Sequence, residues 1–157
     1  MKFYRAEQYQ ASCEVLFLQY ELEIQQLLPD ARIEHIGASS IPMAVSKRDL
    51  DIFVGVDAGE VENAIKLLIT LGFQEKIDTL RTPELCMLES TPNDDVALQI
   101  VANGSEFEDF LAFRDKLRAS ASLLRQYNEL KISCTGWPQE EYRKKKSIFV
   151  EQVLALS

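Results

Sequence analysis

The amino-acid sequence predicts an α+β fold, in which a mixed sheet is flanked by helices and followed by a helical C-terminal third. The predicted order is helix, strand, strand, helix, three strands and then helices, so helices and strands are grouped rather than regularly alternating. The composition is that of a folded globular protein, with 46% hydrophobic and 27% charged residues. A length of 157 residues without a Pro/Gly/Ser-rich linker fits one domain over residues 1–157.

Two helices are predicted in the first half of the chain. Apolar residues recur at helical spacing over residues 6–28, and Pro29 ends that pattern. Asp57 and Glu60 form a D-x-x-E capping signal for the second helix, which Gly72 closes.

Five short segments have the composition of strands. They are rich in β-branched and apolar residues and cover residues 32–36, 49–56, 73–77, 85–89 and 96–102. Turn signals separate the last three, at Thr82-Pro83 and at Thr91-Pro92-Asn93-Asp94. The segment DLDIFVGV at 49–56 is apolar on both faces after its acids, so we expect it to be buried.

The chain from Ser105 onward is predicted to be helical in about three pieces, with breaks near Ser120 and at residues 135–138. Arg114 and Lys146 each interrupt an apolar helical stripe. A cation in such a row either pairs with a carboxylate or a ligand, or extends its charged end to water. For Arg114 a structural ion pair with Asp109 or a strand acid is favoured, and for Lys146 both interpretations stay open.

Charge and composition exclude several classes of function. A net charge of −8 opposes non-specific binding to nucleic acid or to an anionic membrane, although a few focused cations can still hold a small anion. The three cysteines form no CxxC pair, which is typical of buried thiols in the cytoplasm, and no apolar run reaches membrane-spanning length. The single histidine, His35, excludes a zinc site built from several histidines.

Asp49 and Asp51 are the strongest functional signal in the sequence. They lie two residues apart at the start of a strand, and side chains alternate faces with period two, so both carboxylates are expected on one face. Mg²⁺ commonly takes one or two carboxylates together with substrate phosphates. The pair therefore predicts a magnesium site, although acids at a strand start are more often simply solvated.

The loop before these acids adds groups that suit a phosphate. Gly37 permits close backbone approach, Ser39 and Ser40 supply hydroxyl donors, and Lys47 lies just before the strand. Each is an ordinary loop residue by itself, and only the combination with the aspartates indicates a site. His35 on its own is best explained as a strand residue satisfied by a backbone carbonyl.

Two separated stretches resemble the GrpB family. HIGASSIP followed by Lys47 and DLDIFV is similar to the family's His-Ile-Gly-Ser-Thr-Ser-Val-Pro loop, its Lys and its Asp-containing strand. LAFRDKLRASASLLRQYNELK and YRKKKSIFVEQVL resemble its Phe-Arg-Asp-x-Leu-Arg segment with Tyr-x-x-Leu-Lys and its Tyr-x-x-x-Lys helix. The resemblance covers about Glu34 to Leu154.

The resemblance implies a nucleotidyltransferase-like fold. In that superfamily a loop holds the triphosphate and two strand aspartates bind Mg²⁺, which makes Asp49 and Asp51 the candidate catalytic and metal-binding residues. The candidate nucleotide-binding residues combine the loop with recurrent polar positions of the helical part: Gly37, Ser39, Ser40, Lys47, Arg114, Lys131, Tyr142 and Lys146.

The sequence also departs from the family pattern. Met43 stands where a glycine usually follows the proline, and Arg48 where a proline is common. Ala97 and Gln99 occupy the usual His-x-His positions, and neither is ionisable, whereas Asp49 completes a D-x-D.

Two functions remain open. The first is a Mg²⁺-dependent nucleotidyltransferase that uses a nucleoside triphosphate and an unidentified acceptor. The second is a catalytically inactive nucleotide-binding or protein-interaction module of the same fold. The oligomeric state stays open.

Overall fold

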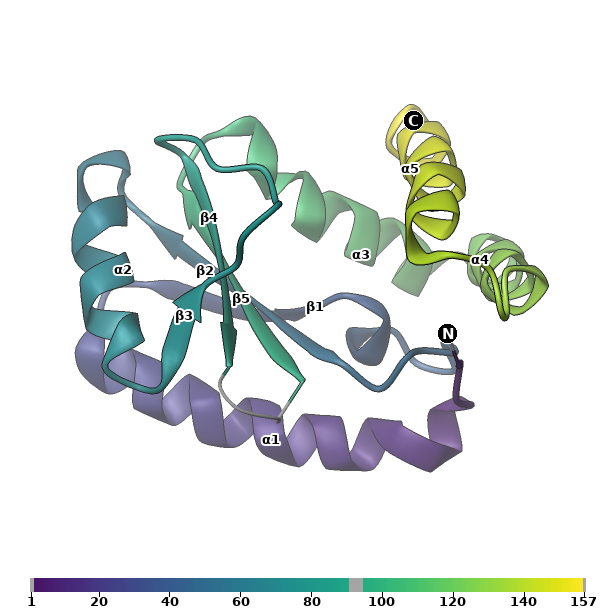
Figure 1. Ribbon diagram of the computed structural model, residues 1–157, viewed down its shortest axis with the longest axis horizontal. Coiled ribbons are helices and arrows are strands. Elements are labelled where there is room, and N and C mark those ends of the chain that lie inside the picture. Colours follow the sequence, from purple (N-terminus) through teal and green to yellow (C-terminus); the bar gives the residue numbers. More distant parts are fainter. Residues whose placement is uncertain (1, 91–94, 157) are drawn as a thin grey trace.

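The protein, described over residues 2–90 and 95–156 by a computed structural model, is built on a five-stranded mixed sheet (Figure 1). The strands lie in the order β1-β2-β5-β4-β3. Their bounds are β1 Arg32–Ile36, β2 Leu50–Val56, β3 Phe73–Glu75, β4 Leu85–Ser90 and β5 Val96–Ala102. Only β2 and β5 pair in parallel, and the other neighbours are antiparallel. The α+β class with a mixed sheet is therefore confirmed.

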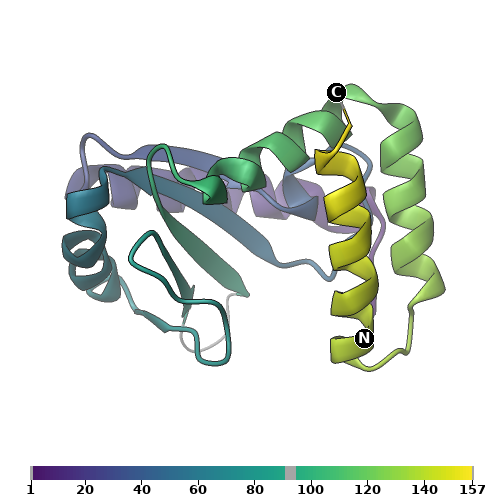
Figure 2. The same cartoon turned by 90° about the horizontal axis from the view of Figure 1, so that it is seen from above.

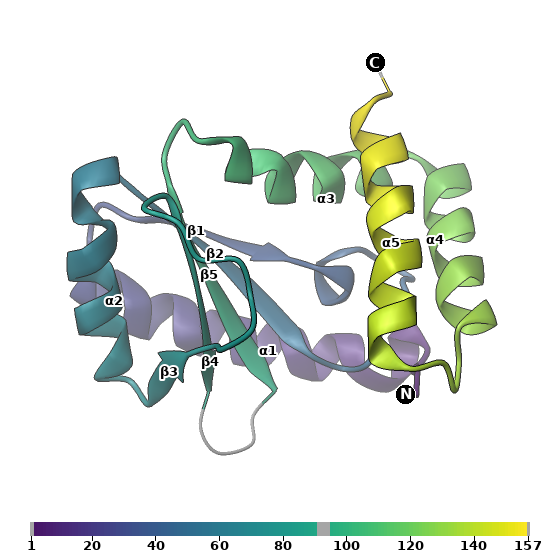
Figure 3. The same ribbon diagram turned by 45° about the horizontal axis from the view of Figure 1, so that its top comes forward.

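Helices cover both faces of this sheet. Helix α1 (Ala6–Leu27) and helix α2 (Val61–Ile69) pack against one face, where the core includes Ile52, Val54 and Leu98. Helix α3 (Asp109–Ala119) lies over the opposite face, whose core contains Phe53 and Val101 (Figure 3). Because successive strand residues alternate faces, even-numbered residues of β2 meet α1 and α2, and odd-numbered ones face α3.

The C-terminal third is helical, as the sequence predicts. Helices α4 (Ala121–Ser133) and α5 (Gln139–Leu154) stand side by side beyond the end of α3 (Figure 2). Leu117, Tyr127, Phe149 and Val153 share a core with the loop residue Ile41. This small core fixes the helices to the loop that precedes the aspartates.

Most predicted element boundaries agree with the structure, and one capping signal does not. Asp57 precedes a short 3-10 turn, Ala58–Glu60, and makes no side-chain cap, so the D-x-x-E pattern does not form a capping box. The backbone itself closes the turn, since the Glu60 N–H donates to the Asp57 carbonyl. The predicted turn at residues 91–94 lies outside the described residues. Within those residues, no helix is long and apolar enough to cross a membrane.

Candidate functional site

A cleft of about 540 Å³ lies between the α3-facing side of the sheet and the C-terminal helices. We call the part formed by the loop before β2, the start of β2 and α5 the aspartate end, and the part formed by β4, β5 and the segment up to the start of α3 the Gln99 end. The aspartate end is lined by Gly37, Lys47, Asp49, Asp51, Tyr142, Arg143 and Lys146. The Gln99 end is lined by Met87, Gln99, Glu106, Phe107, Asp109 and Phe110.

Asp49 and Asp51 both line the aspartate end, where β2 begins. Asp51 pairs in register with Ile36 of β1 and Ala97 of β5, and Asp49 directly precedes the strand. Gly37 closes over Asp51 from the loop, because a Cβ atom at residue 37 would lie 2.5 Å from Asp51 Oδ2. A side chain at this position is therefore incompatible with the present placement of the carboxylate, and the φ of +73° at Gly37 also favours glycine.

The aspartate end concentrates opposite charges in a poorly hydrated space. Burial, and secondly the neighbouring Asp49, raise the pKa of Asp51 from 3.8 to about 6, against the influence of Lys146, Lys47 and Lys76. Burial also lowers the pKa of Lys47, although Asp49 opposes that shift. The ionised form of Asp51 is therefore destabilised at neutral pH, and a bound cation would stabilise it.

Helix α5 supplies further groups to this end. Tyr142 is buried and Lys146 is half-buried, and both line the cleft with Arg143. The Lys47 ammonium lies 5.9 Å from the centroid of the Tyr142 ring, so the loop and the helix meet here. Lys146 lines the cleft, and its charge opposes the rise in the pKa of Asp51.

Lys131 does not line the cleft. It is buried in α4, where its Nζ donates to the Val45 carbonyl at 2.8 Å and lies 3.9 Å from the centroid of the Tyr127 ring. Burial holds its pKa well below the usual value. Lys131 therefore holds the loop against α4, and it can affect a ligand in the cleft only by positioning that loop.

Ser39 and Ser40 line a second cavity and not the aspartate cleft, which corrects the expectation that they share that cleft. The 3-10 turn Ala38–Ser40 directs their hydroxyls into local hydrogen bonds. Ser39 Oγ pairs with His35 Nε2 at 2.8 Å, and Ser40 Oγ donates to the Gly37 carbonyl at 2.6 Å. The two hydroxyls shape the loop around Gly37, and their predicted contact with phosphate would require the loop to move.

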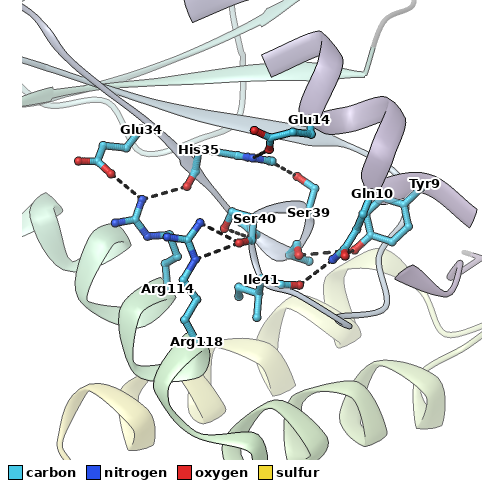
Figure 4. Close-up of polar contacts among 12 residues, drawn as sticks. Tyr9, Gln10, Glu14, Glu34, His35, Ser39, Ser40, Ile41, Arg114 and Arg118 are labelled. Carbon is cyan, nitrogen blue, oxygen red and sulfur yellow. Dashed lines mark hydrogen bonds and ion pairs between the residues drawn. The ribbon is translucent and has the colours of Figure 1, made fainter. Parts of the chain in front are cut away.

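His35 and Arg114 also belong to this second cavity. Both His35 ring nitrogens meet side chains, Glu14 at 3.3 Å and Ser39, rather than the backbone carbonyl expected from sequence. Arg114 is buried and forms an ion pair with Glu34 of β1 at 2.8 Å (Figure 4). The expected pairing with a strand acid therefore occurs, and Arg114 lies outside the aspartate cleft.

Strand β5, which pairs with β2, carries no third acid next to Asp49 and Asp51. Ala97 lies between Asp51 and Glu89 in the sheet register, so Glu89 is two strands away from Asp51, at about 10 Å. Glu89 does not line the cleft, and its Oε1 accepts from Gln74 at 3.4 Å instead. Sequence reasoning identified Gln99 only as a missing histidine, and it did not anticipate the aromatic residues Phe107 and Phe110 in the cleft.

A family model described as "GrpB protein" matches residues 5–156. The chain belongs to the GrpB family. A UPF0157 protein from Vibrio cholerae is 70% identical over 154 residues, which cover 98% of this chain and 82% of that relative. The crystal structure of the conserved protein GrpB from Enterococcus faecalis superposes with a TM-score of 0.71 at 19% identity, covering 96% of this chain and 98% of the other.

This chain is also similar in fold to part of the RNA terminal uridylyl transferase Cid1. One Cid1 structure gives a TM-score of 0.51 at 15% identity, covering 79% of this chain and 38% of Cid1. Another, with Mg and 3'-dATP bound, gives 0.50 at 17% identity, covering 73% of this chain and 38% of Cid1. These likenesses establish a nucleotidyltransferase-like fold for this chain.

Proposed function

We propose that this GrpB-family protein binds a nucleoside triphosphate together with Mg²⁺ and acts as a nucleotidyltransferase. The observation that carries the proposal is the gathering of Asp49 and Asp51 with three cations at one end of a cleft of about 540 Å³. Cavities of about 300–1,000 Å³ are typical of small-molecule and cofactor sites. The fold shared with Cid1, one structure of which holds Mg and 3'-dATP, supports the same assignment.

The chemistry of the acids fits Mg²⁺. Carboxylate oxygens are the ligands that this ion prefers, and Asp49 and Asp51 would hold it. Across residues 2–90 and 95–156, no group of three or more His, Cys, Asp or Glu side chains is arranged to hold a metal by itself. Since Mg²⁺ takes further oxygens from phosphates and water, we expect it to bind with the nucleotide rather than alone. It would neutralise charge on the reacting phosphates.

The remaining residues of the aspartate end position the nucleotide. Lys47, Arg143 and Lys146 are placed to contact phosphate oxygens, and the Tyr142 ring offers an aromatic face to a base. In the transfer, the acceptor hydroxyl forms a bond to the α-phosphorus and the bond to the bridging oxygen breaks, releasing pyrophosphate. The hydroxyl proton passes to one of the two carboxylates. Positioning and charge neutralisation account for most of such catalysis.

A second candidate function is nucleotide binding without turnover. Ala97 occupies the position beside Asp51 where a third carboxylate would complete the site, and Gln99 is neutral. A neutral amide cannot accept a proton or replace an anionic metal ligand. This observation favours a silent binder over a fast enzyme.

Thermal unfolding tests the binding proposal without requiring turnover. Saturation at about 100 times the dissociation constant adds about 2.7 kcal/mol of stability, which raises the melting temperature of a domain this size by about 5–10 °C. We expect that rise with Mg²⁺ plus a nucleoside triphosphate, and little with either alone. Asp51→Asn should abolish it, whereas the exposed-site variant Asp30→Asn should retain it. An equal rise in Asp51→Asn would place the nucleotide elsewhere.

Pyrophosphate release separates the enzyme from the silent binder. Rapid release by the wild type that is lost in Asp49→Asn and Asp51→Asn indicates a transferase that needs only the two acids. If the wild type binds without release, Ala97→Asp introduces a carboxylate beside Asp51. A gain of release in that variant alone would identify the missing acid as the reason for silence.

A further inference from the structure

The Gln99 end of the cleft contains a buried polar group without a partner. The Gln99 side chain is only 8% exposed and lines the cleft, and its Oε1 accepts no hydrogen bond from any residue in the described part of the chain. Such buried orphan acceptors are rare in native proteins, because each one costs about 1–3 kcal/mol. A group that is retained at this cost suggests a ligand that satisfies it.

The strand neighbours of Gln99 cannot supply a hydrogen-bond partner for its Oε1. Gln99 lies in the central strand β5, between Phe53 of β2 and Met87 of β4. Its neighbours two residues away on the same face are Ala97 and Val101. All four are apolar and none can donate a hydrogen bond from its side chain.

The walls of this end define the character of the ligand. Phe107 and Phe110 are half-buried and supply an aromatic surface, while Glu106 and Asp109 are exposed acids that also line the cleft. The cations that line the cleft, Lys47, Arg143 and Lys146, come from the loop before β2 and from α5, not from the segment that carries these acids. A polyanion such as a nucleic acid strand is therefore disfavoured at this end, and a cation beside an apolar body is favoured.

We propose that the Gln99 end is the acceptor subsite, and that it takes a small cationic molecule with an apolar body and a hydroxyl or amine that donates to Gln99 Oε1. The role as acceptor rests on the proposed function, whereas binding at this end does not. Glu106 and Asp109 attract the cationic group, and Phe107 and Phe110 pack against the apolar body. The cleft is then divided between an anionic nucleotide and a cationic acceptor.

Three related probes test this proposal in the metal-free protein. Tyramine carries an aromatic ring, an ammonium and a hydroxyl, 4-hydroxyphenylacetate replaces the ammonium by a carboxylate, and phenethylamine lacks the hydroxyl. Binding is measured by NMR titration, with a short oligoadenylate as the nucleic acid comparison. We expect tyramine to bind at least tenfold more tightly than 4-hydroxyphenylacetate or the oligonucleotide, and more tightly than phenethylamine.

The variants Gln99→Met and Asp109→Asn test which residue causes each of these binding preferences. Gln99→Met should remove the preference for tyramine over phenethylamine and raise the melting temperature of the free protein, because an unsatisfied acceptor is replaced by an isosteric apolar group. Asp109→Asn should reduce the preference for the cationic probe. Leu88→Met, in the neighbouring strand β4 but in the core on the opposite face of the sheet, is the matched control and should change neither ratio.

Opposite outcomes overturn the proposal. One is that 4-hydroxyphenylacetate or oligoadenylate binds more tightly than tyramine. Another is that Gln99→Met leaves the ratio of tyramine to phenethylamine affinity unchanged. The third is that no probe binds at 10 mM, on the order of the weakest fragment affinities. Asp51→Asn separates this subsite from the nucleotide site, since it should lose Mg²⁺–nucleotide binding and keep tyramine binding. If the wild type binds tyramine but does not bind Mg²⁺ with a nucleoside triphosphate, the proposed function is refuted and the subsite is not.

Discussion

The raised pKa of Asp51 predicts that Asp51→Asn stabilises the ligand-free protein at neutral pH. A carboxyl whose pKa rises from 3.8 to about 6 on folding costs at most about 3 kcal/mol at pH 7, at about 1.36 kcal/mol per pKa unit. The side chain keeps some contact with solvent, so screening reduces this figure. At about 2–4 °C per kcal/mol, the variant should melt up to about 6–12 °C above the wild type.

The sign of the pH dependence follows from the direction of the shift. Between pH 3.8 and about 6 the folded protein binds the Asp51 proton more strongly than the unfolded chain does, so acidification through this range stabilises the wild type. The advantage of Asp51→Asn should therefore be fully present above pH 7 and disappear near pH 4. Urea unfolding at several pH values measures it, and the exposed Asp30→Asn should show no comparable gain.

Two results would refute this reasoning. One is an Asp51→Asn protein that is no more stable than the wild type at pH 7, which would mean that Lys47 and Lys146 already compensate the buried charge. The other is a difference that does not shrink on acidification, which would assign the gain to packing rather than ionisation. Adding Mg²⁺ with a nucleoside triphosphate should narrow or cancel the difference, because only the wild type retains both carboxylates and gains about 2.7 kcal/mol.

Further predictions concern the loop and the second cavity. Met43 is exposed with a φ of +69°, so Met43→Gly should raise stability by about 0.5–1 kcal/mol in thermal unfolding while Met43→Ala does not. Arg114→Leu should cost about 3 kcal/mol by breaking the pair with Glu34, and leave the nucleotide dissociation constant unchanged in calorimetry. Burial lowers the pKa of His35, so stability should fall as the pH drops below 6.5, and His35→Gln should flatten that part of the pH profile.

The fold was predictable because its signals are local. Apolar periodicity over residues 6–28 and the β-branched segments around Phe53 and Leu98 specify elements whose type does not depend on distant contacts. The capping pattern at Asp57 failed because a 3-10 turn satisfied the backbone first. The two-residue spacing also predicted correctly that Asp49 and Asp51 line one cleft, although Asp49 lies just before β2 and not within it.

The division of the loop between two cavities was not predictable from spacing. Ser39 and Ser40 turn away from the aspartates because a 3-10 turn places them toward His35 and the Gly37 carbonyl. Short 3-10 turns have no strong sequence pattern, and the choice of side depends on α1, which supplies Glu14. The position of Gln99 between apolar neighbours likewise required the strand order, which pairs β5 with β2 and β4.

The charges of the cleft explain why we expect metal and nucleotide to bind together. Two carboxylates and the cations Lys47, Arg143 and Lys146 leave the aspartate end with a single excess positive charge. A free triphosphate of about four negative charges would overwhelm this excess, and Mg²⁺ alone would add to it. The complex of the two carries about two negative charges and comes closest to neutrality. The strongly acidic protein, at a net charge of −8, repels a free polyanion further, so we expect the less negative Mg²⁺–triphosphate complex to be the form that binds.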